Sequence, residues 1–423
     1  MTASLLAYRV VTALGTPLAG LFLSRRLRRG KEDPKRVGER QGRTSVPRPQ
    51  GRLVWLHGAS VGEAVSLLPF VERVTRSGAH ALVTTGTVTS ATLLAERLPP
   101  GAIHQYAPFD SPFYLRRFLR HWRPEAALIA ESELWPNMLV EAKRARLPIA
   151  MINGRISERS FRRWLKARGF IRAVLSNFDL CLARSESDGE RLAALGAPNV
   201  LIAGDIKFDA PTLPVDRREL AELSGLTSGR QIWIAASTHE GEELIAAAAH
   251  KRLAAVFPDA LTLIAPRHPE RGEAVLREIE GQGLVCALRS RGGRPGPGTA
   301  VYVCDTIGEL GLFYRLAGVV FLGKSFVGGG GQNPIEPARL ACAILHGPMI
   351  GNFADAYAAL DEAKGALQIP RPEGLGEALI ELFENTAKLR AMARAAGDKV
   401  ERLAGAVERS MRALEPLLPA TGS

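Results

Sequence analysis

The sequence predicts an α/β protein built from two successive doubly wound, Rossmann-like domains. Short apolar runs alternate with segments of helical periodicity along most of the 423 residues, which is typical of parallel sheets covered by helices. The alternation stops at the Pro-containing stretch 209–214 and then begins again, so two domains are expected. A hydrophobic content of 46% and a charged content of 23% exclude wholesale disorder.

The first series of apolar runs predicts the elements of the first domain. Strands are expected at 52–57, 80–85, 126–130, 148–152, 179–183 and 200–203. Helices are expected at 61–75, 88–98, near 160–176, at 186–195, and from Pro136, because proline suits the first position of a helix.

The second series predicts the other domain. Strands are expected at 231–236, 260–265, 301–304, 318–322 and 343–345, with helices at 242–257 and near 270–281. The Ala/Leu/Arg-rich segment 373–417 predicts helices on the surface of this second domain. Because open parallel sheets bind ligands beyond the carboxyl ends of their strands, the loops that follow the strands are the places to look for chemistry.

The positive charge is concentrated at the N-terminus. Residues 1–50 hold 11 Lys or Arg against three Asp or Glu, a net charge of +8, so the remaining residues carry only +4 of the total of +12. Residues 2–24 are apolar except for Arg9, and seven basic residues follow between 25 and 36. Charges after the apolar stretch do not fit a cleavable signal peptide. We expect residues 1–30 to anchor the chain to a membrane, by spanning it or by lying at its surface. The alternative is a buried helix followed by a solvated basic cap.

Several functional classes are excluded by composition. No run of 18 uncharged apolar residues occurs, which excludes a polytopic membrane protein. The four cysteines form no CxxC pair and the histidines show no metal-ligand spacing, so neither a zinc site nor a disulfide scaffold is expected. A nearly balanced body without nucleic-acid motifs argues against binding of nucleic acid.

Three groups of residues in the first domain follow predicted strands. His57-Gly58-Ala59-Ser60-Val61-Gly62-Glu63 places Glu63 in the first turn of a helix, where it is either functional or a capping carboxylate. The second group, 130–137, holds two carboxylates, Glu131 and Glu133, beside a tryptophan; Glu133 is alternatively the N-terminal acid of the next helix. The third, 204–209, contains Lys207, which either reaches a ligand or is a surface lysine.

Three further groups lie in the second domain. Residues 237–242 have the character of a helix N-cap and phosphate-contact loop, and Arg267 follows a strand, where a guanidinium suits an anionic ligand. Gly328 to Gly331 precede Asn333 and Pro334, which predict the start of a helix whose free N–H groups bind an anion, with Glu336 placed for a ribose. The alternative is a glycine-rich surface turn.

Taken together, seven segments resemble those of the bacterial 3-deoxy-D-manno-octulosonic acid (Kdo) transferases, in the same order and spacing. They are WLHGASVGE, ESELWPN, GDIKFD, STHEGEE, APRHPER, DTIGELG and GGGGQNPIEP. The resemblance implies the GT-B fold, two facing Rossmann-like domains, here an N-terminal anchor over 1–30, an acceptor domain over 31–208 and a nucleotide-sugar domain over 209–423. It implies transfer of Kdo from CMP-Kdo to a lipid A precursor at the cytoplasmic face of the inner membrane.

The resemblance also assigns roles to individual residues. Glu63 matches the family's catalytic base, and Glu131 and Lys207 match positions that stabilise the transition state. The residues that match the CMP-binding segments are Pro266, Arg267, Ile307, Gly308, Glu309, Asn333, Pro334, Ile335 and Glu336. This sequence departs from the family at Gln332, where the family usually has histidine, and in the weakly charged stretch 326–329.

The expected reaction is an inverting transfer that needs no cofactor and no metal. A carboxylate removes the proton of an acceptor hydroxyl, for which Glu63 is the candidate. No DxD sequence occurs, and CMP leaves with a single phosphate. Two alternatives remain: a GT-B enzyme acting on a different nucleotide sugar, and a noncatalytic membrane-bound scaffold. The intact Glu63, Lys207 and Arg267 argue against the second of these.

Overall fold

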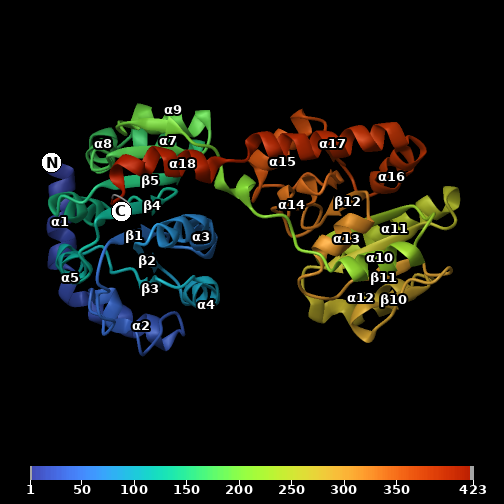
Figure 1. Ribbon diagram of the computed structural model, residues 1–423, viewed down its shortest axis with the longest axis horizontal. Helices are drawn as coiled ribbons and strands as arrows, with labels where there is room; N and C mark the ends of the chain where they lie inside the picture. The colour runs from blue at the N-terminus through green and yellow to red at the C-terminus, as the bar shows by residue number, and fades with distance from the viewer. Residues whose placement is uncertain (1, 420–423) are drawn as a thin grey trace. The chain divides into compact units, whose positions relative to one another are not determined.

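The computed structural model describes residues 2–419 and divides them into two compact units (Figure 1). The first unit comprises residues 2–209 and 404–419, and the second comprises residues 210–403. Each unit is built on one seven-stranded sheet whose strands are all parallel. The predicted pair of parallel α/β domains is therefore confirmed.

The first sheet has the strand order β3-β2-β1-β4-β5-β6-β7. Its strands are β1 Leu53–His57, β2 His80–Thr85, β3 Ala102–Tyr106, β4 Ala126–Ala130, β5 Ile149–Gly154, β6 Leu180–Ala183 and β7 Val200–Ile202. The fully buried β1 lies between β2 and β4, with Trp55 in register with Leu82 and Ala127. The order of the strands reverses between β1 and β4, so this is the topological switch point at which such sheets bind ligands.

Helices cover both faces of this sheet. They are α3 Val61–Arg76, α4 Val88–Arg97, α5 Pro112–Trp122, α6 Pro136–Arg144, α7 Glu158–Leu165, α8 Arg168–Leu175 and α9 Glu186–Leu195. Because side chains alternate along a strand, Trp55 packs in one apolar core with residues of α5, α6 and α8. Val54 and Leu56 pack in the other core with residues of α3.

The C-terminal helix α18 (Ala406–Leu414), red in Figure 1, belongs to the first unit and packs against α3 and the 3₁₀ turn Ile206–Asp209. The Asp209 carboxylate accepts hydrogen bonds from the backbone N–H groups of Gly405 and Val407, and Leu414 is buried in the core with Leu56. This corrects the expectation that all helices of 373–417 cover the second domain. Only α16 (Gly374–Glu384) and α17 (Thr386–Leu403) do so, and the first stretch of the first unit ends at 209 rather than 208.

The second sheet has the order β10-β11-β9-β8-β12-β13-β14, so its switch point lies between β8 and β12. Its strands are β8 Ile232–Thr238, β9 Leu261–Pro266, β10 Cys286–Leu288, β11 Val301–Val303, β12 Val319–Leu322, β13 Ala343–His346 and β14 Ala366–Gln368. The accompanying helices are α10 Arg217–Leu226, α11 Glu242–Val256, α12 Gly272–Glu280, α13 Leu310–Leu316, α14 Ile335–Arg339 and α15 Ala354–Glu362. The strands β3, β10 and β14 were not among those predicted.

The N-terminal helices α1 (Ala3–Leu14) and α2 (Ala19–Arg28) are part of the first unit rather than a separate segment. Arg9 is buried and binds the side chains of Asn137 and Glu141 on α6. Among residues 2–419, no single helix is long and apolar enough to cross a membrane. In this described part of the chain, one pair, α1 with Thr16–Arg28, has a suitable length and composition, and it is bent by 45°.

Candidate active site

The two predicted catalytic carboxylates follow β1 and β4, the strands that flank the switch point of the first sheet. Glu63 lies in the first turn of α3, just beyond β1, and Glu131 follows β4 directly. Glu131 adopts a left-handed backbone conformation with φ of +50°, and its N–H donates to the carbonyl of Ile152 at 2.9 Å. Such a conformation costs a non-glycine residue about 1–3 kcal/mol, and strained residues of this kind are enriched at functional sites.

The Glu63 carboxylate caps its own helix through one oxygen. Its Oε2 accepts hydrogen bonds from the N–H groups of Ala59 at 2.6 Å and Ser60 at 3.1 Å, and the Ser60 hydroxyl accepts from the N–H of Glu63. The capping role that the sequence left open is therefore present. Among the described residues, Oε1 has no hydrogen-bond partner, so the same side chain can hold its position with one oxygen and receive a proton on the other.

Glu131 lies among charged groups that include both other predicted catalytic residues. Burial raises the pKa of Glu131, and the neighbouring Glu63 carboxylate raises it further. The positive charge of Lys207, in the 3₁₀ turn Ile206–Asp209, opposes that rise in pKa. The structure therefore brings Glu63, Glu131 and Lys207 together, although Glu63 and Lys207 are more than 140 positions apart in the sequence.

Two arginines in this cluster were not predicted from the sequence. The positive charges of Arg155 and Arg184 also oppose the raised pKa of Glu131. Arg184 pairs with Asp188 at 3.1 Å and with Asp205 at 3.5 Å, and Asp205 accepts from the backbone N–H of Lys207 at 3.0 Å. Arg155 follows β5 and Arg184 follows β6, so both lie at the carboxyl edge of the sheet, as Glu131 does. Their position directly after predicted strands is the sequence signal that could have identified them.

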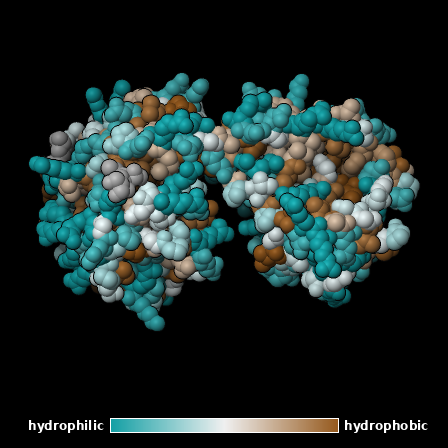
Figure 2. Space-filling view, in the orientation of Figure 1, coloured by the Kyte–Doolittle hydropathy of each residue, from teal (hydrophilic) through white to brown (hydrophobic). Residues whose placement is uncertain are grey.

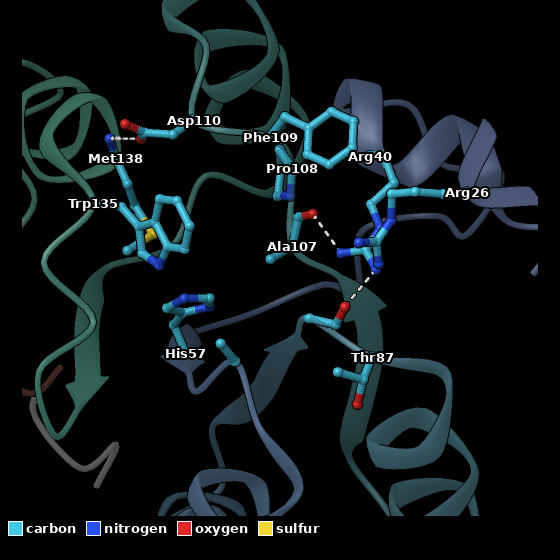
Figure 3. Close-up of a pocket in the computed structure, with 12 residues that line it drawn as sticks. Arg26, Arg40, His57, Thr87, Ala107, Pro108, Phe109, Asp110, Trp135 and Met138 are labelled. Carbon is cyan, nitrogen blue, oxygen red and sulfur yellow. Dashed lines mark hydrogen bonds between the residues drawn. The ribbon is translucent and has the colours of Figure 1, made fainter. Parts of the chain in front are cut away.

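A pocket of about 300 Å³ adjoins the first turn of α3 (Figure 3). His57 and Trp135 lie at one side of it, Arg40 and Arg26 at the other, and Phe109 contributes an apolar wall. Ala59, whose N–H binds the Glu63 carboxylate, also lines this pocket, so the candidate base lies next to a cavity large enough for part of a ligand.

The buried side chain of Arg40 connects the loops around this pocket. Its Nη2 donates to the carbonyl of Gly86 at 2.7 Å, and its Nη1 donates to the carbonyl of Ala107 at 3.1 Å. The N–H of Gly86 in turn donates to the carbonyl of Ala59 at 2.9 Å, and a Cβ on Gly86 would meet that oxygen at 2.9 Å. A continuous set of hydrogen bonds therefore runs from Arg40 to the backbone that holds Glu63.

The candidate nucleotide-binding residues all lie in the second unit, at the carboxyl edge of its sheet. Pro266 is the last residue of β9, and Arg267, which is exposed, follows it and donates its backbone N–H to the carbonyl of Thr238 at 2.9 Å. Ile307 is exposed and Gly308 has φ of +87°. The exposed Arg267 guanidinium and the loop at 307–308 are thus open to a ligand.

The Glu309 carboxylate has a partner that the sequence did not indicate. Arg289 donates to both of its oxygens, at 3.0 and 2.6 Å, and this pairing holds the pKa of Glu309 below its usual range. Glu309, which the resemblance places in a CMP-binding segment, therefore carries a tightly bound guanidinium on its carboxylate.

The glycine-rich segment leads into a short helix at the predicted position. Gly328 to Gly331 all have positive φ, which favours glycine. The following helix α14, Ile335–Arg339, is five residues long, and Pro334 before it already has helical dihedral angles. The Asn333 side chain accepts from the N–H of Ile335 at 3.1 Å, as the predicted N-cap would, and donates to Glu336 at 3.1 Å. Burial raises the pKa of Glu336.

The start of this segment is held by a buried carboxylate of α11. Glu242 accepts hydrogen bonds from the backbone N–H groups of Lys324 at 2.7 Å and of Ser325 and Phe326 at 3.1 Å. The Gln332 amide lies 3.2 Å from His239 Nε2, so this residue takes part in a polar contact at the position where it departs from the family. Within residues 2–419, no three His, Cys, Asp or Glu side chains are grouped as metal ligands.

Comparison with known proteins identifies the family. Residues 35–210 match the family described as 3-deoxy-D-manno-octulosonic-acid transferase (kdotransferase). A 3-deoxy-D-manno-octulosonic acid transferase of Bordetella pertussis is 34% identical over 421 residues, which cover 95% of this chain and 96% of that protein. The chain belongs to the Kdo transferase family. A probable mitochondrial Kdo transferase of Arabidopsis thaliana is also 34% identical over 413 residues, covering 95% of this chain and 92% of that protein.

Solved structures of other proteins share the fold of this family member. A UDP-GlcNAc 2-epimerase from Neisseria meningitidis, bound to UDP-GlcNAc, matches with a TM-score of 0.57 at 13% identity, over 86% of this chain and 100% of that chain. A glycosyltransferase from Rickettsia africae also matches with a TM-score of 0.57, at 10% identity over 87% of this chain and 99% of that chain. At these identities, the likeness concerns the fold alone.

Proposed function

We propose that this Kdo transferase moves Kdo from CMP-Kdo to a hydroxyl of a lipid A precursor in lipopolysaccharide synthesis, with inversion at the anomeric carbon. The observation that carries the proposal is the grouping of Glu63, Glu131 and Lys207 at the switch point of the first sheet. We also infer that, as in other GT-B enzymes, the first unit binds the acceptor and the second unit binds the nucleotide sugar.

The chemistry needs a base, because an alcohol is a poor nucleophile. Glu63 Oε1 takes the proton of the acceptor hydroxyl as the new glycosidic bond forms and the bond to the CMP phosphate breaks. Its Oε2 stays fixed by Ala59 and Ser60, so the base does not have to be oriented during the reaction. Positioning of this kind is a large part of the effect of a catalytic group.

Charge develops at two places in this transition state. The anomeric carbon becomes positive, and the ionised Glu131 carboxylate stabilises it. The departing phosphate becomes negative, and Lys207 stabilises it. In the second unit, the exposed Arg267 is available to bind the anionic nucleotide. Charges interact more strongly where burial lowers the effective dielectric constant. Glu131 is in such a place, because burial is the main cause of its raised pKa.

The proposal is tested by supplying ready-made CMP-Kdo and a lipid A precursor and following the release of CMP. We expect release to depend on the acceptor. If another nucleotide sugar supports transfer while CMP-Kdo does not, the chain is a GT-B enzyme with a different donor.

We further propose that α1 and α2 lie on the cytoplasmic surface of the inner membrane. Their outward face exposes large apolar side chains, with Leu14 at 75% and Leu21 at 71% of their full exposure, whereas Figure 2 shows mostly hydrophilic residues over the visible face of the first unit. Arg25, Arg28 and Arg29 are exposed next to this apolar face. Such a combination suits insertion among anionic lipid headgroups. The docking of Arg9 onto α6 favours this position over a span.

The membrane proposal predicts the effect of a triple substitution, Leu14→Ser, Leu18→Ser and Leu21→Ser. Because these side chains are exposed, folding should be unchanged, while binding to vesicles containing anionic lipid should weaken at least about tenfold. Deletion of residues 1–30 is a poorer test, since it removes the buried Arg9. Serine at the exposed Leu226, Val256 and Val285 of the second unit is the matched control. Vesicle binding by the triple variant equal to that of the control would exclude this face as the anchor.

A further inference from the structure

The pocket beside Glu63 contains a buried polar atom without a protein partner. His57, the last residue of β1, is only 2% exposed and lines the pocket. Its Nε2 makes no hydrogen bond with the residues that the structure describes. The Glu133 carboxylate lies close to this atom, with its Oε2 3.7 Å away. A buried donor left without a partner is costly, so this atom points to a ligand.

The groups around His57 favour the tautomer of the neutral ring that carries its proton on Nε2. Trp55 Nε1 donates to Thr84 Oγ1 at 2.8 Å, and this hydroxyl lies 2.9 Å from His57 Nδ1. The tryptophan can only donate, so the hydroxyl accepts from it. The hydroxyl can donate its own proton to Nδ1 or, over the longer distance of 3.5 Å, to the carbonyl oxygen of Leu56. The shorter contact with Nδ1, together with the Glu133 carboxylate that faces Nε2, favours the proton on Nε2, so His57 presents an N–H donor to the pocket.

Glu133 supplies an acceptor at the same place. Its Oε2 accepts a hydrogen bond from Trp135 Nε1 at 2.6 Å. Burial acts to raise the pKa of Glu133, but His57 and Trp135 outweigh it, so the pKa lies below its usual value and the carboxylate is ionised at neutral pH. Glu133 is therefore not the N-terminal acid of α6, which begins only at Pro136.

His57 and Glu133 together suit a hydroxyl group of a ligand better than an anion. A hydroxyl both accepts and donates, so it can accept from His57 Nε2 and donate to Glu133 Oε2, two atoms that lie 3.7 Å apart. A phosphate at this point would meet the negative charge of Glu133. The basic residues across the pocket are themselves engaged, because Arg26 and Arg40 share the Glu32 carboxylate, at 2.6 and 2.9 Å.

The walls of the pocket fit a sugar ring. The indole of Trp135 is partly exposed and lies beside His57, and Met138 and Phe109 extend the apolar wall (Figure 3). Aromatic faces with a few placed polar groups are typical of small-molecule sites, and about 300 Å³ is at the small end of their range. The pocket therefore holds one ring of a substrate rather than a whole lipid.

We propose that His57 and Glu133 hold one hydroxyl of the acceptor sugar, with its ring against Trp135, and so orient the acceptor beside Glu63. This inference rests on the proposed function and deepens it, because it assigns the acceptor subsite to named residues. Ala59 connects this subsite to the candidate base, since it lines the pocket and its N–H binds the Glu63 carboxylate.

His57→Phe tests the proposal, because it keeps a ring of similar size and removes the donor. We expect the KM for the lipid A precursor to rise at least about tenfold, while the KM for CMP-Kdo stays within twofold. Glu133→Gln, which keeps an oxygen for Trp135, should raise the acceptor KM in the same way. His250→Phe is the matched control. His250 is also buried and its Nδ1 also lies 2.9 Å from a threonine hydroxyl, that of Thr262, but in the second unit.

A second readout tests the tautomer directly. Nitrogen NMR of the full chain should show His57 protonated at Nε2, and Thr84→Val should remove this preference and also raise the acceptor KM. An unchanged acceptor KM in both His57→Phe and Glu133→Gln, each as stable as His250→Phe, would overturn the proposal. If His57→Phe does not fold, Glu133→Gln and Thr84→Val decide the question.

The failure of this inference is distinguishable from the failure of the proposed function. If the unmodified chain transfers Kdo while these variants keep their acceptor KM, only the subsite is wrong. If the unmodified chain does not use CMP-Kdo, calorimetry with the deacylated sugar headgroup of the lipid A precursor still tests the pocket. We expect binding that His57→Phe weakens at least about tenfold, and equal binding by both proteins would overturn the assignment.

Discussion

Replacing Glu63 by glutamine should lower turnover by at least about 100-fold while the protein remains folded. The amide oxygen of glutamine can still accept from Ala59 and Ser60, so the cap of α3 is kept. The substitution removes only the ability to accept a proton, and loss of a general base typically lowers the rate 10²- to 10⁴-fold. Steady-state kinetics with saturating CMP-Kdo and acceptor measure this effect.

Glu72→Gln is the matched control for this experiment. Glu72 lies on the same helix, is exposed, and pairs only with Arg76 in the described structure. Both variants should bind CMP as the unmodified chain does, because the candidate nucleotide site lies in the other unit. Turnover of a folded Glu63→Gln protein close to that of Glu72→Gln would exclude Glu63 as the base.

Replacing Lys207 by methionine should have the second largest effect, a fall in kcat of roughly 100- to 1,000-fold, the range for loss of one group that stabilises transition-state charge. The substitution also affects Glu131. Because the charge of Lys207 opposes the raised pKa of Glu131, its removal should raise that pKa further. Protonation of Glu131 then begins at a higher pH, so the acid side of the kcat profile should move to higher pH.

Lys143→Met provides the comparison. Lys143 pairs with Asp179, which precedes β6 and so lies at the opposite edge of the sheet from Glu131. This variant should keep both the kcat and the pH profile. A Lys207→Met enzyme with an unchanged pH profile would show that Lys207 does not act on Glu131, even if its turnover were low.

The central strands were predictable from the sequence, whereas three edge strands were not. Buried strands such as β4 and β8 have a continuous apolar run, because both faces of a parallel sheet are covered. The strands β3, β10 and β14 lie at sheet edges, and β3 reads Ala-Ile-His-Gln-Tyr, without such a run. Their pairing with β2, β11 and β13 supplies the stability that their own composition does not indicate.

The positions of the candidate site residues at strand ends were predictable from the sequence, whereas the hydrogen bonds and ion pairs between their side chains were not. Glu63, Glu131 and Lys207 each follow a strand, and the resemblance assigned their roles. The pairings of Glu309 with Arg289 and of His57 with Thr84 join different strand ends, so no local pattern reveals them. The same holds for α18, because its place in the first unit depends on Asp209, about 200 residues away.

Mass spectrometry of the lipid product tests the central claim most directly. The full chain is incubated with CMP-Kdo and a lipid A precursor, and the lipid is analysed together with the CMP released. We expect the lipid to gain the mass of one or more Kdo residues, with one CMP released for each. An unmodified lipid in the presence of folded protein and intact CMP-Kdo, or a lipid modified only when another nucleotide sugar is supplied, would contradict the account.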